Sequence, residues 1–431
     1  MNARIFPLAA MTAGILLVGA AQANNEATNT NPAIDSTGVD RARISAGTQM
    51  NPTISVILDG VYANFSREVE GPAGFGSHDH GDDHDHEHEH GLEEGFSLRE
   101  TEISVSASID NYLDGVMTLA IEGNSGIKVE EAYILTRSLP AGLQIKAGRF
   151  LSDIGYINRQ HPHDWQFADR PLVSELLFGE HGLQDNGMQL SWLPSTSFYS
   201  RYGIEILQGE TTMASQDVHE TLEEDHGPRL YTAFAKFAPD LGMNHAAMFG
   251  FSGGISTSFK KEEEHDDEVE LWEGDGWFAG IDAVYKYNSG KPFGHGNWIV
   301  QGEYYFREIS AEFTEIENQI IEEQFSGRSK QDGFYLQALY GFAPRWSTGL
   351  RVDGVGLTNT SLEPGNDAFE SFDASYRYAA QVSFAPTEFS RLRLQVNNYD
   401  YAHDDGDHGH DAWGVMLQYN VSLGAHGAHQ F

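Results

Sequence analysis

Cysteine is absent from the 431 residues of this chain. Its absence excludes disulfide bridges and thiolate metal sites, so the fold has to be held together by backbone pairing and side-chain packing. Long apolar runs are also missing after residue 23, where no stretch approaches the roughly 20 apolar residues that a transmembrane helix needs. Mean hydropathy is negative, at -0.41. If the chain crosses a membrane, it therefore does so with strands.

Positive charge is scarce. The sequence holds 26 Lys and Arg against 64 Asp and Glu, which gives a formal net charge of -38. Such a charge repels nucleic acid, which we exclude as a partner, and it concentrates cations near the protein. The alternative, that the acidic loops only keep the surface soluble, stays open at this point.

The N-terminal segment resembles an export signal. Arg4 is followed by an apolar run from residue 8 to residue 21, and Ala21-Gln22-Ala23 has the small-x-small pattern that signal peptidase accepts. We expect residues 1–23 to be a signal peptide and residues 24–50 to be a short periplasmic segment. Residues 51–431 remain for the folded part, in which we see no linker and no helix-period segment, so a single domain is expected.

Prolines recur at near-regular intervals, each in a short turn between two stretches that alternate apolar and polar residues. The turns read LPAG, LPST, APDLG, KPFG, APRW and APTE, and they hold Pro140, Pro194, Pro239, Pro292, Pro344 and Pro386. Between one turn and the next, the chain has room for one strand, a longer polar loop and a returning strand. Tight turns at one edge and long loops at the other are typical of an up-and-down outer-membrane β-barrel.

The last strand shows the alternation most clearly. In residues 412–424, apolar side chains from Trp413 to Leu423 occupy every second position, and Gln418 and Asn420 lie on the other face. A β-sandwich is the alternative, but it would bury its apolar face between two sheets and would seldom keep Arg, Gln and Asn on the other side. We predict an all-β, transmembrane, antiparallel barrel of about sixteen strands, beginning near residues 51–66, with both termini on the periplasmic side.

Histidine is concentrated in two predicted external loops, residues 67–95 and residues 402–411. Imidazoles and carboxylates at alternate positions suit Zn(II) or a related divalent cation, and without thiolates the sites would be N/O-ligated and exchange rapidly. The alternative is a solvated loop that binds metal only incidentally. The candidate metal ligands are His78, His80, His84, His86, His88, His90, His403, His408 and His410. Further histidines, among them His161 and His163, are expected on other external loops.

The third external loop, residues 157–181, carries enough apolar residues to need burial, and the barrel interior is the available place. We therefore expect it to fold inward and narrow the pore. Its acids would face inward-pointing arginines on later strands, which would create a transverse field across the constriction. The alternative is that the arginines only pair with lumen acids to hold the wall. The predicted constriction residues are Asp164, Asp169, Glu175, Glu180, Arg351, Arg377, Arg391 and Arg393.

Two resemblances to known families add to this interpretation. The run KAGRFLSDIGYINRQHPHDWQFADRP, residues 146–171, resembles the strand and constriction-loop region of the phosphate-selective porin O/P superfamily. The ending SLGAHGAHQF resembles the C-terminus of histidine-rich, zinc-regulated outer-membrane proteins, some of which are described as TonB-dependent receptors. Together they imply a sixteen-strand Gram-negative porin, trimeric, produced when zinc is scarce.

The chain departs from both families. Lysine is scarce, so phosphate selectivity is not carried over, and residues 24–50 are too short for the plug domain of a TonB-dependent receptor, which argues against energised transport. The terminal Phe431 matches the aromatic end by which the barrel-assembly machinery recognises its substrates. No grouping of Ser, His and an acid stands out on a strand wall, and we expect no enzyme.

The expected function is passive diffusion through an outer-membrane porin whose acidic, histidine-rich mouth captures zinc or related divalent cations. No cofactor is expected to be required, and Zn(II) or another divalent transition metal is the expected ligand. The expected surroundings are outer-membrane lipid and lipopolysaccharide, with a homotrimer as a possibility, external loops extracellular and termini periplasmic. Two alternatives remain: a general porin for small polar solutes, and a barrel-anchored surface protein that binds metal.

Overall fold

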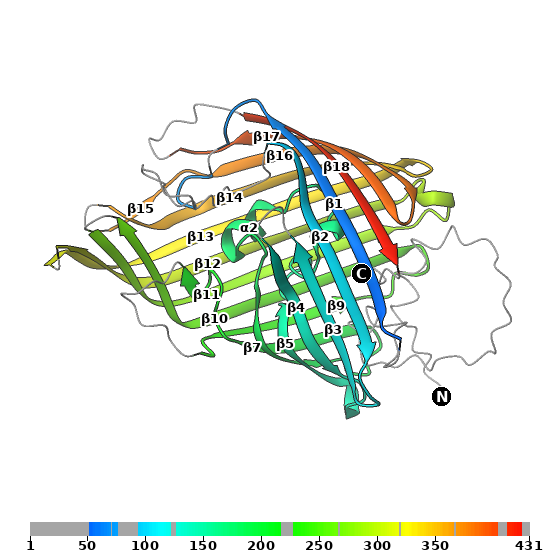
Figure 1. Ribbon diagram of the computed structural model, residues 1–431, viewed down its shortest axis with the longest axis horizontal. Coiled ribbons are helices and arrows are strands. Elements are labelled where there is room, and N and C mark those ends of the chain that lie inside the picture. Colours follow the sequence, from blue (N-terminus) through cyan, green and yellow to red (C-terminus); the bar gives the residue numbers. More distant parts are fainter. Residues whose placement is uncertain are drawn as a thin grey trace.

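The computed structural model describes residues 51–69, 71–75, 94–121, 126–216, 227–265, 268–318, 320–365, 368–403 and 412–424. Within these residues the chain forms one large antiparallel sheet that curls into a barrel (Figure 1). No helix in these ranges is long and apolar enough to cross a membrane. The strands are β1 (Thr53–Phe65), β2 (Gly95–Ser108), β3 (Leu113–Ile121), β4 (Ile127–Thr136), β5 (Leu143–Leu151), β6 (Gln184–Trp192), β7 (Tyr199–Leu207), β8 (Ser215–Gln216), β9 (Leu230–Ala238), β10 (His245–His265), β11 (Glu268–Tyr287), β12 (Trp298–Glu317), β13 (Ile320–Ala343), β14 (Trp346–Pro364), β15 (Phe369–Ser371), β16 (Ser375–Thr387), β17 (Ser390–Asp400) and β18 (Ala412–Gly424).

Strand pairing closes the sheet into a ring. Each long strand pairs antiparallel with the next, and β1 pairs with both β2 and β18, with Ser55 opposite Gly424 at the seam. The two shortest strands are additions to this ring: β8 lies parallel to part of β10, and β15 pairs with the end of β14. The remaining strands form the closed 16-strand barrel, which confirms the predicted fold class; each of these sixteen strands has a neighbour on both sides.

The two faces of the wall have opposite chemistry. On β18, Leu417 is 47% exposed and Tyr419 is 45% exposed, whereas Gln418 between them is 1% exposed. Gln395 and Asn397 on β17 are fully buried in the same way. The predicted alternation is therefore present, with apolar side chains outside and polar side chains inside, which is the arrangement that a bilayer around a hydrated lumen requires.

The six proline turns lie at one edge of the barrel, together with the turn between β2 and β3. In three of them the residue after the proline has a positive φ: 62° at Ala141, 56° at Phe293 and 70° at Arg345. Two of these turns contact each other, because the Arg345 guanidinium lies 4.5 Å from the centre of the Phe293 ring. Short 3-10 turns, η2 (Pro140–Gly142) and η4 (Pro292–Gly294), tighten this edge further.

The opposite edge differs from the prediction of long polar loops. Strands β10 to β14 continue as tall hairpins, and the acidic stretch between residues 259 and 272 is strand over most of its length. The reason is that aromatic residues recur on the inner face: Phe259, Trp272 and Phe313 are fully buried there, and Phe369 of β15 packs against them. One side of the barrel wall is thus taller than the other (Figure 1).

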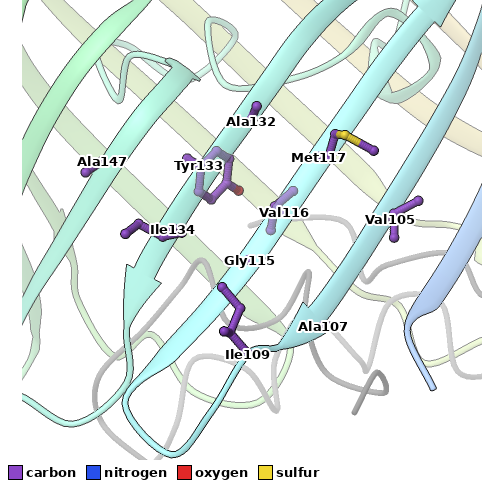
Figure 2. Close-up of a pocket in the computed structure, with 10 residues that line it drawn as sticks. All are labelled: Val105, Ala107, Ile109, Gly115, Val116, Met117, Ala132, Tyr133, Ile134 and Ala147. Carbon is purple, nitrogen blue, oxygen red and sulfur yellow. The ribbon is translucent and has the colours of Figure 1, made fainter. Parts of the chain in front are cut away.

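The outer face also varies around the ring. Strands β2 to β5 carry a shallow groove with a volume of about 510 Å³ (Figure 2). Its lining includes Ala107, Gly115, Ala132 and Ala147, which present short side chains or none. The remaining residues of the groove are Val105, Ile109, Val116, Met117, Tyr133 and Ile134.

Because the outer face of the wall is apolar, a charged side chain placed there is expected to lower the free energy of unfolding, more at mid-strand than near the strand end. Leu417→Arg places a guanidinium at mid-strand in the lipid-facing row and is expected to lower the free energy of unfolding by about 2–4 kcal/mol. Leu423→Arg, at the end of the same row, is expected to cost about 0–1 kcal/mol. Unfolding by guanidinium in lipid vesicles measures both values, and equal costs at the two positions would contradict a lipid-facing β18.

Candidate functional site in the barrel interior

The segment from residue 152 to residue 183 joins β5 to β6 and folds into the barrel interior, where its helix lies inside the ring of strands (Figure 1). It contains η3 (Pro162–Asp164) and α2 (Leu172–Phe178), and a proline starts each: Pro162 is the first residue of η3, and Pro171 precedes α2. The inward fold of this third loop is as predicted. Its apolar residues form one core with the wall, in which the loop contributes Ile154, Ile157, Trp165, Leu172, Val173, Leu177 and Phe178.

Wall side chains hold the loop by its backbone. A loop without regular structure leaves peptide groups unpaired, and burial makes each unpaired group costly. Here inward-pointing acids, one amide and one hydroxyl accept from loop N–H groups, and inward-pointing lysine and arginine side chains donate to loop carbonyls. The acceptors are Glu205 for Asp153, Ser252 for Gly155, Glu303 for Ile157, Gln395 for Ala168 and Asp353 for Leu172; the donors are Lys236 to Gly155, Arg391 to His163, Arg393 to Trp165, Arg377 to Arg170 and Arg307 to Leu177.

Gly155 marks the closest approach between the loop and the wall. Its φ is 56°, and a Cβ atom at this position would lie 2.1 Å from both Glu303 Oε2 and the Tyr305 hydroxyl. Only glycine accepts this conformation and this contact. The loop is therefore fixed against β12 at a defined height in the barrel.

Asp169 is the centre of an ion-pair network with two wall arginines. Its carboxylate lies 2.8 Å from Arg351 Nη2 and 3.0 Å from Arg377 Nη1, and both arginines also contact Asp353 on the wall. Gln395 and Asn397 donate to the same carboxylate over 2.6 and 2.8 Å. Burial raises the pKa of Asp169, but the two guanidinium groups outweigh burial and lower it well below its usual range.

The other predicted constriction residues have different partners. Arg391 and Arg393 donate to loop carbonyls, as described above, rather than facing acids across a gap. Asp164 lies 3.5 Å from the His163 ring. Glu180 is exposed, and Glu175 on α2 is half-buried. Burial raises the pKa of Glu175 to about 7, against the attraction of Arg377.

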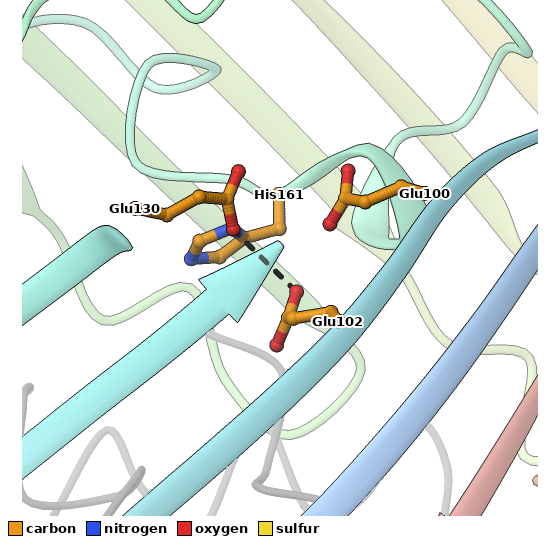
Figure 3. A group of neighbouring side chains, drawn as sticks. All are labelled: Glu100, Glu102, Glu130 and His161. Atoms are coloured by element: carbon orange, nitrogen blue, oxygen red, sulfur yellow. Dashed lines mark ion pairs between the residues drawn. The ribbon is translucent and has the colours of Figure 1, made fainter. Parts of the chain in front are cut away.

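A second polar group lies where the loop meets β2 and β4. Glu100 and Glu102 point inward from β2, Glu130 points inward from β4, and His161 reaches them from the loop (Figure 3). One ligand atom from each residue lies within 4.8 Å of all the others, and all four side chains are buried. His161 Nδ1 lies 3.6 Å from Glu102 and 3.3 Å from Glu130, while Nε2 lies 3.0 Å from Glu131.

His163 extends this group. Its ring stacks on that of His161 with 5.9 Å between centres, and its Nδ1 lies 3.1 Å from Glu102. Burial lowers the pKa of both imidazoles, but the carboxylates around them outweigh burial: Glu102 and Glu130 raise the pKa of His161 well above its ordinary value, and Asp164 and Glu102 raise the pKa of His163 to about 9. Both histidines lie on the third external loop, as predicted, but the inward fold of this loop buries them, so they do not face the outside.

Most of the predicted external-loop ligands lie outside the described residues: His78, His80, His84, His86, His88, His90, His408 and His410. The same holds for residues 1–50 and for the C-terminal segment ending at Phe431. His403, at the end of β17, is described and is half-buried. Metal binding by these nine external-loop histidines stays a prediction.

Sequence reasoning missed Glu100, Glu102 and Glu130. The i, i+2 spacing of Glu100 and Glu102 was a usable signal, because it places both side chains on one face of a strand. Glu130 gave no such signal. In β4, the register with β3 shifts by one residue, so that Thr118 pairs with Glu131 and Leu119 with Val129. This bulge turns both Glu130 and its neighbour Glu131 inward.

No model of a known protein family matches the chain. A protein of Aquifex aeolicus (strain VF5), described as "Uncharacterized protein", is 32% identical over 398 residues, which is 88% of this chain and 80% of that protein. Among solved structures, OprB of Pseudomonas putida has a TM-score of 0.52 at 10% identity, covering 86% of this chain and 94% of that one. The anion-selective porin of Comamonas acidovorans has a TM-score of 0.49 at 11% identity, with 86% and 99% covered. At such identity the likeness to OprB shows the fold alone, a porin-like barrel.

The network around Asp169 predicts a specific effect on the loop. Among the described residues, Asp169→Asn leaves Asp353 as the remaining ion-pair partner of Arg351 and Arg377. Breaking a buried pair of this kind costs about 3–5 kcal/mol. Hydrogen exchange followed by mass spectrometry is expected to show faster exchange at amides 160–178. Glu180→Gln, on the same loop but exposed, is the control and is expected to change stability by less than about 0.5 kcal/mol. Unchanged exchange in Asp169→Asn would show that the network does not hold the loop.

Proposed function

This chain belongs to the same protein family as the Aquifex aeolicus relative, and we propose that it is an outer-membrane channel for passive diffusion. The observation that carries the proposal is the closed 16-strand barrel with an apolar outer face, a polar inner face and a loop folded into its interior. A barrel of this size has a lumen wide enough for water. An inward loop then sets which solutes pass, because it replaces part of that water by fixed charges.

Divalent cations, zinc above all, are the solutes that we propose. The formal net charge of -38 attracts cations to the barrel mouth. His78, His80, His84, His86, His88 and His90 in one loop, and His403, His408 and His410 in another, supply imidazole among carboxylates. Many weak and rapidly exchanging sites suit conduction better than one strong site, which would retain the ion.

The constriction that we propose is formed by the inward loop and the wall opposite it. The loop contributes Asp164, Asp169, Glu175 and Glu180, and the later strands contribute Arg351, Arg377, Arg391 and Arg393. The ion pairs of Asp169 and the contacts of the arginines with loop carbonyls support a rigid constriction. Within the part of the chain that the structure describes, Glu175 and Glu180 form no ion pair with these arginines, so they are then the acids that solutes meet.

The outer membrane is the proposed location, with the histidine-rich loops outside and the termini in the periplasm. The apolar belt around the barrel supports a bilayer as its surroundings. Contacts with lipopolysaccharide and with the barrel-assembly machinery, and a homotrimeric assembly, stay predictions, as do the signal peptide and the periplasmic segment.

Single-channel recording in a planar bilayer tests the function directly. The refolded protein is expected to conduct with a preference for cations, and micromolar zinc is expected to change the current. A variant in which the six histidines from His78 to His90 are replaced by Gln keeps the length and the acids of the loop. It is expected to keep the conductance and lose most of the zinc effect.

Each other outcome of this recording rejects part of the proposal. Conductance that is indifferent to zinc in both proteins leaves a general porin for small polar solutes. No conductance in either protein rejects the channel and leaves a barrel that anchors a metal-binding surface.

The raised pKa of Glu175 predicts a pH dependence of selectivity. With a pKa of about 7, this carboxyl is charged at pH 8 and mostly neutral at pH 6. Acidification therefore removes a negative charge beside Asp169, Glu180, Arg170 and Arg377, and the preference for cations is expected to fall between these pH values. Reversal potentials in a salt gradient measure the preference. The Glu175→Gln channel is expected to show the low-pH cation preference at both pH values, whereas Glu180→Gln is expected to keep the pH dependence. A Glu175→Gln channel whose cation preference changes with pH like that of the wild type would reject the assignment to Glu175.

A further inference from the structure

The group of Glu100, Glu102, Glu130 and His161 is separate from the histidine-rich loops and from the Asp169 network. We propose that these four residues bind one divalent first-row transition metal ion inside the barrel, where the third loop meets β2 and β4 (Figure 3). The site lies within the proposed channel, but it does not require that the channel conducts.

The donor atoms are close to the spacing that a metal needs. Zinc binds carboxylate oxygen and imidazole nitrogen at about 2.0–2.2 Å, which places the ligand atoms of a tetrahedral site about 3.4 Å apart. His161 Nδ1 is already 3.3 Å from Glu130 and 3.6 Å from Glu102. All four ligand atoms fall within 4.8 Å of one another. A small change of side-chain torsion in Glu100 would complete the set.

Two carboxylate oxygens in the group have no hydrogen-bond donor among the described residues. They are Oε2 of Glu102 and Oε2 of Glu130, on side chains that are more than nine-tenths buried. Both atoms lie at ion-pair distance from an imidazole nitrogen without the alignment of a hydrogen bond: Glu130 Oε2 is 3.3 Å from His161 Nδ1, and Glu102 Oε2 is 3.1 Å from His163 Nδ1. A buried carboxylate oxygen without a donor is costly, and three buried carboxylates repel one another. A divalent cation at this point removes both costs.

The imidazole is oriented as a ligand. His161 Nε2 lies 3.0 Å from the Glu131 carboxylate, whose other oxygen accepts from the Leu151 N–H over 3.3 Å. A carboxylate on the second ring nitrogen is the usual companion of a metal-binding histidine, because it fixes the ring and raises its basicity. The nitrogen left over, Nδ1, is the one that faces Glu102 and Glu130.

The backbone of β2 and β4 positions the carboxylates of this site. Glu100 and Glu102 share the inner face of β2, and the bulge in β4 turns both Glu130 and Glu131 inward, one as a ligand and the other as the companion of His161. Bulges often re-aim side chains next to functional sites. His161, the residue directly before η3, then lies between these carboxylates.

The donor set selects the class of metal. Three carboxylates and one imidazole suit Zn(II), Mn(II) or Fe(II), and the chain has no thiolate for Cu(I). The carboxylates also supply enough negative charge to balance a divalent ion in a buried position. A bound ion would join the third loop to β2 and β4, so the loop would gain a metal anchor in addition to its hydrogen bonds.

Zinc binding to the full-length protein in detergent tests the site. The parent protein for this test carries Gln in place of the nine histidines proposed for the two external loops, so that these loops do not mask the signal. They are His78, His80, His84, His86, His88, His90, His403, His408 and His410. After treatment with a chelator, zinc is returned at constant pH and binding is measured by isothermal titration calorimetry, with X-ray absorption spectroscopy to report the ligand types. We expect one tight zinc per barrel, with N/O ligands only, and a zinc-dependent rise in Tm.

Three variants assign the ligands. Glu102→Gln and His161→Gln are expected to weaken zinc binding by at least about tenfold, and Glu131→Gln by about 10–100-fold with the stoichiometry unchanged. Glu312→Gln, an exposed acid on a tall hairpin, is the control and is expected to bind zinc like the parent. Heat-modifiable migration on a gel checks that each barrel has folded; if Glu102→Gln does not fold, Glu100→Gln replaces it.

The outcomes separate this site from the channel. Absence of a stoichiometric zinc in the folded parent, or equal affinity in parent, Glu102→Gln and His161→Gln, overturns the site even if the barrel conducts. A tight zinc that these variants lose supports the site even if planar bilayers show no current.

Discussion

The structure depends on one constraint: a peptide segment that enters a barrel has to find partners for its own N–H and C=O groups. The third loop meets the constraint with the inner wall, whose acids, amides and guanidinium groups pair with loop backbone on strands from β7 to β17. This is why the inner face is so polar, and why so many of its charged side chains are buried. The same pairing gives the loop its fixed height and therefore fixes where Asp169, Glu175 and His161 stand.

Much of the fold was predictable because its signals are local. Proline turns and strict alternation of side chains follow from backbone geometry, and they gave the strand number and the two faces. The tall hairpins were not predicted, since stretches such as KKEEEHDDE have the composition of a loop; the buried Phe259 and Trp272 decide the matter, and their packing against Phe369 is a tertiary contact. Charge on one face does not prevent a strand when aromatic residues fill the other.

Part of the candidate site was likewise predictable from the sequence, and part was not. The inward fold of the third loop followed from its apolar content, and its arginine partners followed from their place on inward faces. The meeting of His161 with three glutamates could not be predicted, because it needs a one-residue bulge in β4 and the path of a loop across the lumen. The partners of Arg391 and Arg393 were also beyond the sequence, since a carbonyl of the backbone carries no residue-specific signal.

The distance along the chain between the loop and its holders has a consequence for assembly. Arg391 and Arg393 contact the carbonyls of His163 and Trp165, 228 residues away in each case, and β17 is among the last strands to be made. Contacts so remote in sequence form late, because the entropy of closing so long a loop has to be overcome first. Until the seam between β1 and β18 closes, the third loop lacks the donors for these carbonyls. Closure of the barrel and seating of its inner loop are therefore one coupled step, and a chain that lost its final strands would lose the order of its interior as well.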